Sequence, residues 1–412
     1  MGAADEMPPS RVAAASWPQW HGADRTNVSP ETGLLATWPP AGPRLLWTAA
    51  GCGKGYSSVT IADGRIYTAG ELNKQTVVMA FDLEGKRLWQ APNGDCWQAP
   101  EDIAYAKDYY GARSTPTVAG ELVYHLGELG GLTAYRAATG EKLWTINIRE
   151  QFAAPLPKYG YAESVLVVDD RLFCYPGGEK GYMVALNAKT GETVWANTII
   201  GDSAAYCSPI LVRDRQARQL ITMSTEAALG VDADTGRLLW RYPFTNPRKI
   251  NANTPLYRDG AVFITSGYGA GGVMLGLVPV GDRVVATKLW ATSSLDDQHG
   301  GVVIVAGAIY GSGHESPGWS RLDVATGKLC FRDRALEKGS LTVADGMLYC
   351  LGEKGSVALV APARQAFEIR NRFTLPQTPN GPVWAHPVVC GGRLYIRHGD
   401  LLYCYDVKGD PP

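Results

Sequence analysis

One short phrase recurs along this chain. It consists of two apolar residues, usually an Asp or Asn, a tight turn ending in glycine, and an aromatic residue four positions later. The copies place these last two residues at Gly85 and Trp89, Gly140 and Trp144, Gly191 and Trp195, Gly236 and Trp240, and Gly327 and Phe331. Internal similarity at a spacing of roughly 40 to 55 residues indicates an array of supersecondary units. The repeat therefore determines the architecture.

A second phrase precedes the first in each repeat. It contains two alternating apolar runs joined by an Asp-Gly or similar glycine-containing turn, as in residues 57–67, 114–124, 340–349 and 386–395. Such turns join antiparallel strands because glycine and Asp accept positive φ angles. The two phrases together predict a four-stranded antiparallel meander. We count eight of them, with seven or nine as alternatives, starting near Tyr56, Arg113, Ala162, Tyr206, Ala252, His299, Lys338 and Trp384.

The eighth unit contains only three strands, at residues 387–389, 393–397 and 401–406. The segment 44–47 carries Trp47 and resembles the aromatic strand of the other units, but no three strands precede it. Pairing of the two segments would close a ring and remove exposed sheet edges. The sequence thus predicts an all-β, eight-bladed β-propeller. We expect residues 1–43 to be an N-terminal extension packed on the ring, and residues 44–412 to be a single domain.

The pattern Ala-x-Asp/Asn-x-x-Thr-Gly-x-x-x-Trp resembles that of the pyrroloquinoline-quinone-like (PQQ-like) β-propeller superfamily. That superfamily includes quinoprotein alcohol dehydrogenases and the outer-membrane assembly lipoprotein BamB. The segments 17–22, 27–29, 160–164 and 384–387 are similar, more narrowly, to PQQ-like repeat proteins of planctomycetes and related bacteria. The resemblance covers nearly the whole chain. It implies the fold but not the function, because the Trp packs between neighbouring sheets with or without a cofactor.

Composition limits the classes of partner. The formal net charge is −1 at pH 7, which argues against the basic face that nucleic-acid binding requires. The sequence has no apolar run long enough to span a bilayer, and residues 1–15 do not read as a signal peptide. The resemblance implies an exported protein, periplasmic or extracellular, without its signal in this sequence. We expect a monomer.

Eight cysteines are too few for a disulfide scaffold of this length. Cys174, Cys350 and Cys404 lie in apolar strands, where cysteine usually fills the core. Cys52 and Cys96 occupy matching linkers of adjacent units, so a disulfide between them is an alternative to two free thiols, the default expectation.

The residues that lead into the innermost strands converge on one mouth of the central channel. When the eight units are aligned at their starts, the residues at the first two positions are chemically varied. Those at the third position are nearly uniform in small residues. A site built from different blades would have this variety, because each blade contributes one donor or acceptor. The candidate ligand-binding residues are Tyr56, Arg113, Glu163, Tyr206, Asn253, His299, His314, Lys338, Trp384 and His386. The alternative is structural, with such groups satisfying each other, for example Arg113 pairing with Glu163.

Three of the six histidines are expected near this mouth. His299 starts the innermost strand of the sixth unit, His314 lies in a loop of the same unit, and His386 enters the channel two units later. Three imidazoles near one opening could bind zinc or copper, or act as general acid and base. The alternative is that each is a hydrogen-bonded structural group.

Three functions fit these residues. A quinoprotein dehydrogenase would hold PQQ and Ca²⁺ in the channel, with Glu163 and Asn253 as the first candidates for the metal and the base. The chain lacks the adjacent cysteines of several such enzymes and a Cys-x-x-Cys-His motif, and it is shorter than the catalytic members. A binding or scaffold protein would engage a small molecule, glycan, peptide or partner protein, with aromatic side chains as stacking surfaces.

The third function is a carbohydrate-active enzyme that uses Arg113, Glu163, His299 and His386. The sequence favours binding and leaves both catalysis and the identity of any cofactor open.

Overall fold

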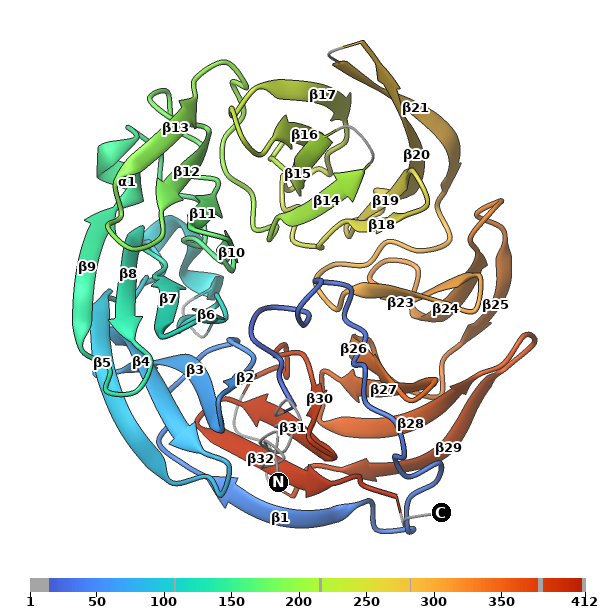
Figure 1. Cartoon of the computed structure of the whole chain (residues 1–412). Helices are drawn as coiled ribbons and strands as arrows, with labels where there is room; N and C mark the ends of the chain where they lie inside the picture. The colour runs from blue at the N-terminus through green and yellow to red at the C-terminus, as the bar shows by residue number, and fades with distance from the viewer. Residues whose placement is uncertain (1–14, 107–108, 215–216, 282, 377–380, 410–412) are drawn as a thin grey trace, which may run out of the picture.

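The structure is a computed structural model that describes residues 15–106, 109–214, 217–281, 283–376 and 381–409. Its strands form eight four-stranded antiparallel sheets. Figure 1 shows these sheets as the blades of one ring, which confirms the predicted eight-bladed propeller. The first part of the predicted N-terminal extension, residues 1–14, lies outside the described residues.

Each blade runs from an innermost strand to an outermost strand. The innermost strands are β2 (Thr60–Ala62), β6 (Thr117–Ala119), β10 (Leu166–Val168), β14 (Ile210–Asp214), β18 (Leu256–Arg258), β22 (Val302–Val305), β26 (Gly339–Ala344) and β30 (Val388–Cys390). The second strands are β3 (Arg65–Leu72), β7 (Leu122–Leu126), β11 (Arg171–Cys174), β15 (Ala217–Met223), β19 (Ala261–Ser266), β23 (Ala308–Gly313), β27 (Met347–Gly352) and β31 (Arg393–His398).

The outer half of each blade follows the same order. The third strands are β4 (Gln75–Asp82), β8 (Gly131–Arg136), β12 (Met183–Asn187), β16 (Ala227–Asp232), β20 (Gly271–Val280), β24 (Gly318–Asp323), β28 (Ser356–Pro362) and β32 (Leu401–Asp406). The outermost strands are β5 (Arg87–Asp95), β9 (Lys142–Asn147), β13 (Thr193–Asn197), β17 (Leu238–Pro243), β21 (Arg283–Thr292), β25 (Leu329–Asp333), β29 (Phe367–Thr374) and β1 (Arg44–Ala49).

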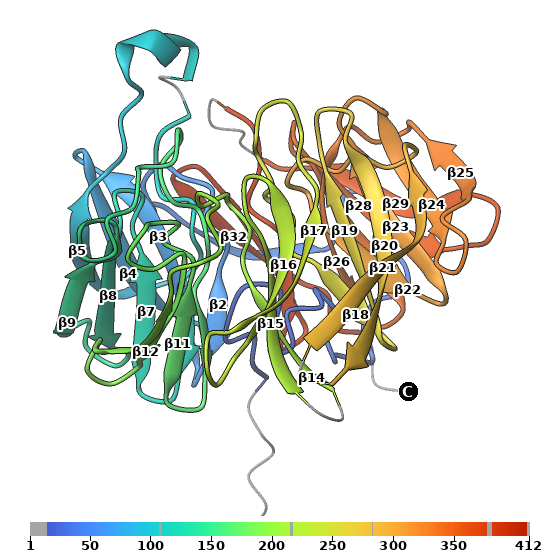
Figure 2. The ribbon, with the colours of Figure 1, turned by 90° about the horizontal axis from the view of Figure 1, so that it is seen from above.

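Two short helices lie in the loops, η1 (Glu101–Ala106) and α1 (Ile148–Gln151). We call the face on which residues lead into the innermost strands the upper face, and the opposite face the lower face. In Figure 2 the loop that carries η1 projects from the upper face.

The inner hairpins follow the turn chemistry that the sequence predicts. Asp63 and Gly64 have φ angles of 48° and 71°, and Asp345 and Gly346 have 46° and 72°. Two consecutive positive φ angles define the type I′ turn, whose twist matches that of the strands it joins. The Asp-Gly pairs therefore fix these hairpins locally.

The N-terminal strand closes the ring. Strand β1 pairs antiparallel with β32, with Arg44 opposite Asp406 and Trp47 opposite Cys404, and the eighth sheet has the order β1-β32-β31-β30. The predicted pairing of the two ends is confirmed.

The repeated phrase joins each blade to the next. Trp89 of blade 1 donates its indole N–H to the carbonyl of Ala137 in blade 2 at 2.9 Å. The ring of Trp89 also lies on Gly140, where a Cβ atom would be 2.5 Å from Cε3 of the Trp. The same contact joins Trp47 to Gly85, Trp144 to Gly191, Trp195 to Gly236 and Trp290 to Gly327. The glycine is thus required both by its positive φ and by the neighbouring blade.

Among the described residues, three of the eight junctions lack this contact between Trp and glycine: those that lead into the fifth, seventh and eighth units. The sequence predicts that the fifth and seventh units lack the Thr-Gly turn, and β20–β21 and β28–β29 are indeed long hairpins. Trp240, which precedes the fifth unit, donates instead to Gln219 Oε1 of its own blade at 2.9 Å. Phe331, which precedes the seventh unit, has no side-chain N–H group to donate. Each deviation at the turn is therefore matched by a deviation in the preceding aromatic residue.

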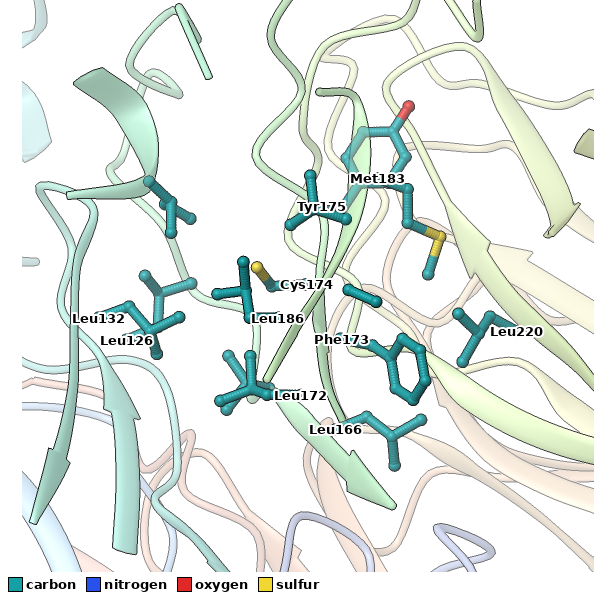
Figure 3. Packing of buried hydrophobic residues seen from close by; sticks show 14 of the residues in the cluster. Leu126, Leu132, Leu166, Leu172, Phe173, Cys174, Tyr175, Met183, Leu186 and Leu220 are labelled. Atoms are coloured by element: carbon teal, nitrogen blue, oxygen red, sulfur yellow. The ribbon is translucent and has the colours of Figure 1, made fainter. Parts of the chain in front are cut away.

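The hydrophobic core lies between the blades. Figure 3 shows its largest described cluster, in which Leu126 and Leu132 of blade 2 lie with Leu172 and Leu186 of blade 3. All eight cysteines are free, and Cys330 is the exposed one. Cys52 and Cys96 are therefore two buried thiols, the default expectation, and the alternative disulfide is wrong.

The third position of each unit, counted from its start, has a structural role. The amide of Ser58 donates to Thr115 Oγ1, that of Thr115 to Ser164 Oγ, and that of Ser164 to Ser208 Oγ, at 2.8–3.0 Å. Thr115, Ser164 and Ser208 each thus satisfy a buried amide of the preceding blade, which gives small hydroxyl residues at this position a structural role.

We expect Gly140→Ala to destabilise the protein more than Gly64→Ala. Both glycines have a φ near +72°, but a Cβ at Gly64 has no atom within 4 Å. Gly64→Ala should therefore cost about 1 kcal/mol for the backbone alone. Gly140→Ala should cost about 1–3 kcal/mol more because Trp89 must move. Thermal unfolding of the two variants measures the difference, and equal losses would contradict the packing role of Gly140.

Candidate functional site

An aromatic cluster on the upper face joins three of the predicted site residues. The ring of Trp384 lies 4.7 Å, centroid to centroid, from Tyr56 and 4.7 Å from His299. Tyr109, from the loop that carries η1, stacks on Trp384 at 5.4 Å. Because these residues come from blades 8, 1 and 6 and from the loop between blades 1 and 2, the cluster lies where the blades converge.

Arg113 borders the aromatic cluster but does not pair with Glu163. Its guanidinium lies 5.9 Å from the Tyr56 ring centroid and 5.1 Å from that of Trp97. It donates hydrogen bonds to the carbonyls of Tyr109 and Gly111. The alternative in which Arg113 and Glu163 neutralise each other is therefore wrong for the described contacts. Arg113 instead holds the loop around the mouth.

Glu353 organises the charged side of this cluster. Its Oε1 accepts the indole N–H of Trp384 at 2.7 Å and lies 3.1 Å from Nζ of Lys338. Lys338 also donates to Gln298 Oε1 at 2.6 Å. The sequence interpretation did not name Glu353. Its position after the second strand of blade 7 matches that of His314 in blade 6, so the same loop argument could have found it.

His299 has no hydrogen-bond partner for either ring nitrogen among the described residues, although both nitrogens are buried. Its Nε2 is 3.5 Å from Glu353 Oε1. Burial, followed by the positive charge of Lys338, lowers the pKa of His299 well below its usual value. The imidazole is therefore neutral at physiological pH, with unused capacity to donate and accept.

Deeper in the channel lie two buried carboxyl groups and an amide. Glu163 Oε2 accepts the amide of Tyr175 at 2.9 Å, and Asp297 Oδ1 accepts that of Gly301 at 3.2 Å. Asn253 Nδ2 donates to the carbonyl of Asp297 at 2.6 Å. The remaining side-chain oxygen of Glu163, Asn253 and Asp297 is buried, and the described residues offer it no hydrogen bond. Burial raises the pKa of Glu163 and that of Asp297 to about 8.

The segment 17–29, which we call the plug, lies against the innermost strands below these groups. His21 donates from Nε2 to Nδ1 of His386 at 3.0 Å, and His386 donates from Nε2 to the carbonyl of His299 at 2.8 Å. That carbonyl fixes the tautomers, because it can only accept. Burial lowers the pKa of His386 to about 4, so both rings are neutral near pH 7.

Arg25 anchors the plug to blades 3 and 4. Its guanidinium donates to the carbonyls of Ser164, Val165 and Pro209 at 2.5–2.9 Å. Burial lowers the pKa of Arg25 to about 9, which leaves it charged at neutral pH. Arg25 is the cation whose charge lowers the pKa of Glu163, opposing the larger effect of burial.

The three histidines predicted as metal ligands are not gathered into a metal-binding group. His386 uses both ring nitrogens, and His314 Nδ1 accepts the amide of Tyr268 at 3.2 Å. No group of three His, Cys, Asp or Glu side chains in the described ranges is placed to hold a metal ion.

The remaining ligand-binding candidate is Tyr206. Its hydroxyl accepts a hydrogen bond from the amide of Tyr159 at 3.3 Å.

Comparison with known proteins gives a family and a fold. A family model described as outer membrane protein assembly factor BamB matches residues 73–328. The BamB of Shewanella oneidensis is 29% identical over 163 residues, 38% of this chain and 39% of that protein. The BamB of Burkholderia pseudomallei is 26% identical over 260 residues, 60% of this chain and 57% of that protein.

The matched regions thus span less than two thirds of both relatives. The solved structure of quinohemoprotein alcohol dehydrogenase from Comamonas testosteroni superposes with a TM-score of 0.64 at 14% identity, covering 96% of this chain and 81% of that one. This likeness concerns the fold alone. No helix in the described part of the chain has the length and apolar character needed to cross a membrane.

We expect Glu163→Gln to stabilise the protein increasingly as the pH rises from 5 to 8. The folded-state pKa of Glu163, about 8, exceeds the ordinary value of 4.5. The folded wild type therefore holds a proton that the unfolded chain releases, and it loses stability as the pH rises through this range. Glutamine is neutral throughout and avoids this loss, whose slope is at most about 1.4 kcal/mol per pH unit.

Thermal unfolding at each pH measures this difference, and Glu179→Gln, at an exposed position of the same blade, is the control. A difference between Glu163→Gln and wild type that stays constant with pH would contradict the assignment.

Proposed function

This chain belongs to the BamB family of PQQ-like propellers, and we propose that it is an exported binding protein whose ligand occupies the upper mouth of the channel. The observation that carries the proposal is the pair of buried, unpartnered ring nitrogens of His299 beside Trp384, Lys338 and Glu353. A buried polar group without a partner costs about 1–3 kcal/mol. A ligand that hydrogen-bonds to His299 would recover this free energy.

The chemistry of the mouth favours a polar ligand with one apolar face, such as a sugar ring. Tyr56 and Trp384 offer aromatic surface for stacking, while Lys338 and Arg113 offer hydrogen-bond donors and Glu353 an acceptor. Sugars present C–H groups on one face and hydroxyl groups around their edge, which fits this combination. A peptide or a protein loop with an aromatic tip is the alternative ligand. We expect the protein to act as a monomer.

Export is part of the proposal. Two relatives carry the name outer membrane protein assembly factor, and we extend to this chain the location outside the cytoplasm that the name suggests. A scaffold role in protein assembly also fits a propeller. It requires contact with a partner protein, which binding measurements with purified components can detect.

We expect His299→Ala and Arg113→Ala to abolish ligand binding without unfolding the protein. Removal of His299 deletes the free imidazole, and removal of Arg113 releases the loop that borders the mouth. Binding is measured by screening labelled protein on a glycan array and then by calorimetry with the strongest glycan. Lys354→Ala, at an exposed lysine next to Glu353, is the matched control. Unchanged binding in both variants would overturn the site, whereas unfolding of both would make the residues structural.

A quinoprotein oxidoreductase is the second candidate, and one observation favours it. Glu163, Asn253 and Asp297 each keep one buried oxygen without a partner inside the described structure, and carboxylate and amide oxygens are the ligands that Ca²⁺ takes. The donor chemistry fits a calcium ion held with a quinone, for which Glu163 and Asn253 would be the ligands. The quinone would supply the hydride acceptor. Asp297, protonated at neutral pH, could take up or release a proton at its free Oδ2.

Metal analysis distinguishes the two candidates. Mass spectrometry and an absorbance spectrum on protein purified without chelator or histidine tag should show neither stoichiometric calcium nor quinone absorbance if the protein only binds a ligand. Calcium together with quinone absorbance, both lost in Glu163→Gln, would establish the second candidate instead.

A further inference from the structure

A second candidate site lies on the lower face. A cavity of about 440 Å³ opens there between the plug and blades 4, 5 and 6. It is lined by residues 24–26 and 28 of the plug, 210–213 of β14, 255–258 at β18, and Ile304 of β22. The upper-face residues precede the innermost strands, whereas this cavity reaches the ends of β14 and β18. The two sites are therefore separate.

The cavity wall consists of strand edges. Four consecutive residues of β14 line it, and so do all three residues of β18. Consecutive residues of a strand point to opposite faces of the sheet, so a run of lining residues presents the backbone as well as side chains. Both strands are terminal in their sheets, which leaves one edge of each free of sheet partners. A free strand edge is a template for pairing with an extended peptide.

The plug uses the innermost strands of other blades in this way. Trp17 exchanges two backbone hydrogen bonds of 2.8 Å with Ile61 in β2. The amide of Val118 in β6 donates to the carbonyl of Pro18 at 2.7 Å. Val343 in β26 accepts from the amide of Ser29 at 2.7 Å and donates to the carbonyl of Asn27 at 3.0 Å. The innermost strands thus accept an extended segment as an additional partner.

The plug leaves blades 4, 5 and 6 without such pairing. Over the described ranges, no backbone hydrogen bond joins it to β14, β18 or β22. In blade 4 it reaches only the carbonyl of Pro209, through the side chain of Arg25. In the described part of the lower mouth, the cavity is therefore one place where strand edges have no backbone partner.

Two arginines stand among the strand residues that line the cavity. Arg213 of β14 is exposed and forms no ion pair with a described residue. Arg258 of β18 pairs with Asp259 at 3.1 Å, where both side chains are about half exposed or more. The acidic residue of the lining, Asp24, belongs to the plug on the other side. A ligand along β14 therefore meets arginine.

We propose that the lower-face cavity binds an extended segment of a partner protein that carries an acidic side chain. The segment pairs through its backbone with the free edge of β14, and its carboxylate binds the guanidinium of Arg213. This mode is strand addition, in which main-chain hydrogen bonds supply affinity and one side-chain contact supplies selectivity. The proposal is independent of the upper-face site.

The test uses a fluorescein-labelled, end-blocked peptide of sequence Thr-Val-Thr-Glu-Val-Thr, and fluorescence anisotropy with the full chain. We expect it to bind, and we expect Arg213→Ala to weaken it about tenfold or more, because a charge-assisted hydrogen bond is lost. A peptide with Lys in place of Glu should bind at least about tenfold more weakly to the wild type, and Arg213→Glu should reverse this preference. Arg370→Ala, at an exposed arginine of β29, is the control and should leave the affinity unchanged.

A peptide with N-methyl groups on alternate residues tests the backbone pairing. It keeps the charge but lacks the amide donors of one edge, so it should lose binding. The proposal is overturned if the acidic peptide does not bind, if Arg213→Ala binds it as tightly as the wild type, or if the N-methylated peptide binds equally. His299→Ala should bind the peptide normally, which separates this result from a failure of the upper-face site.

Discussion

The contact between a tryptophan and the glycine of the next blade supports the rest of the structure. The indole ring occupies the space where a Cβ atom would lie, and in five junctions its N–H reaches a carbonyl of the neighbouring turn. Since both halves of the contact lie in the same short phrase, each blade specifies its neighbour through local sequence. The loops of the upper face are then free to vary without loss of the ring.

The N-terminal segment completes the junction between blades 7 and 8, which the repeat does not. Gly42, just before β1, lies against Phe373 of blade 7, where a Cβ atom would be 2.6 Å from Cγ. This segment thus provides the glycine that blade 8 lacks at the corresponding place. The plug, further toward the N-terminus, fills the channel with Trp20, His21 and Arg25.

The sequence was sufficient to predict the ring and its closure, because Asp-Gly turns, alternating strands and the Trp phrase are local signals. For the candidate site, the sequence predicted the location better than it predicted the contacts between side chains. The arrangement placed Tyr56, His299 and Trp384 at one mouth, and these side chains do meet. Glu353 was missed because the loop argument that placed His314 was not applied to blade 7, and the contacts of Arg113 depend on a loop without a repeat counterpart. The contact between His21 and His386 joins residues 365 positions apart, which no local pattern encodes.

The topology of β1 also bears on the order in which the molecule can be assembled. The plug and β1 are synthesised before the other strands of the ring, yet β32, the strand that β1 pairs with, is synthesised after all of them. Until then the plug can engage only the blades already formed, and β1 has no sheet to join. Closure of the ring therefore depends on synthesis of β32, because a chain that stops before β32 leaves both β1 and the rim of blade 7 uncovered. Ring closure therefore requires that all eight blades have been made.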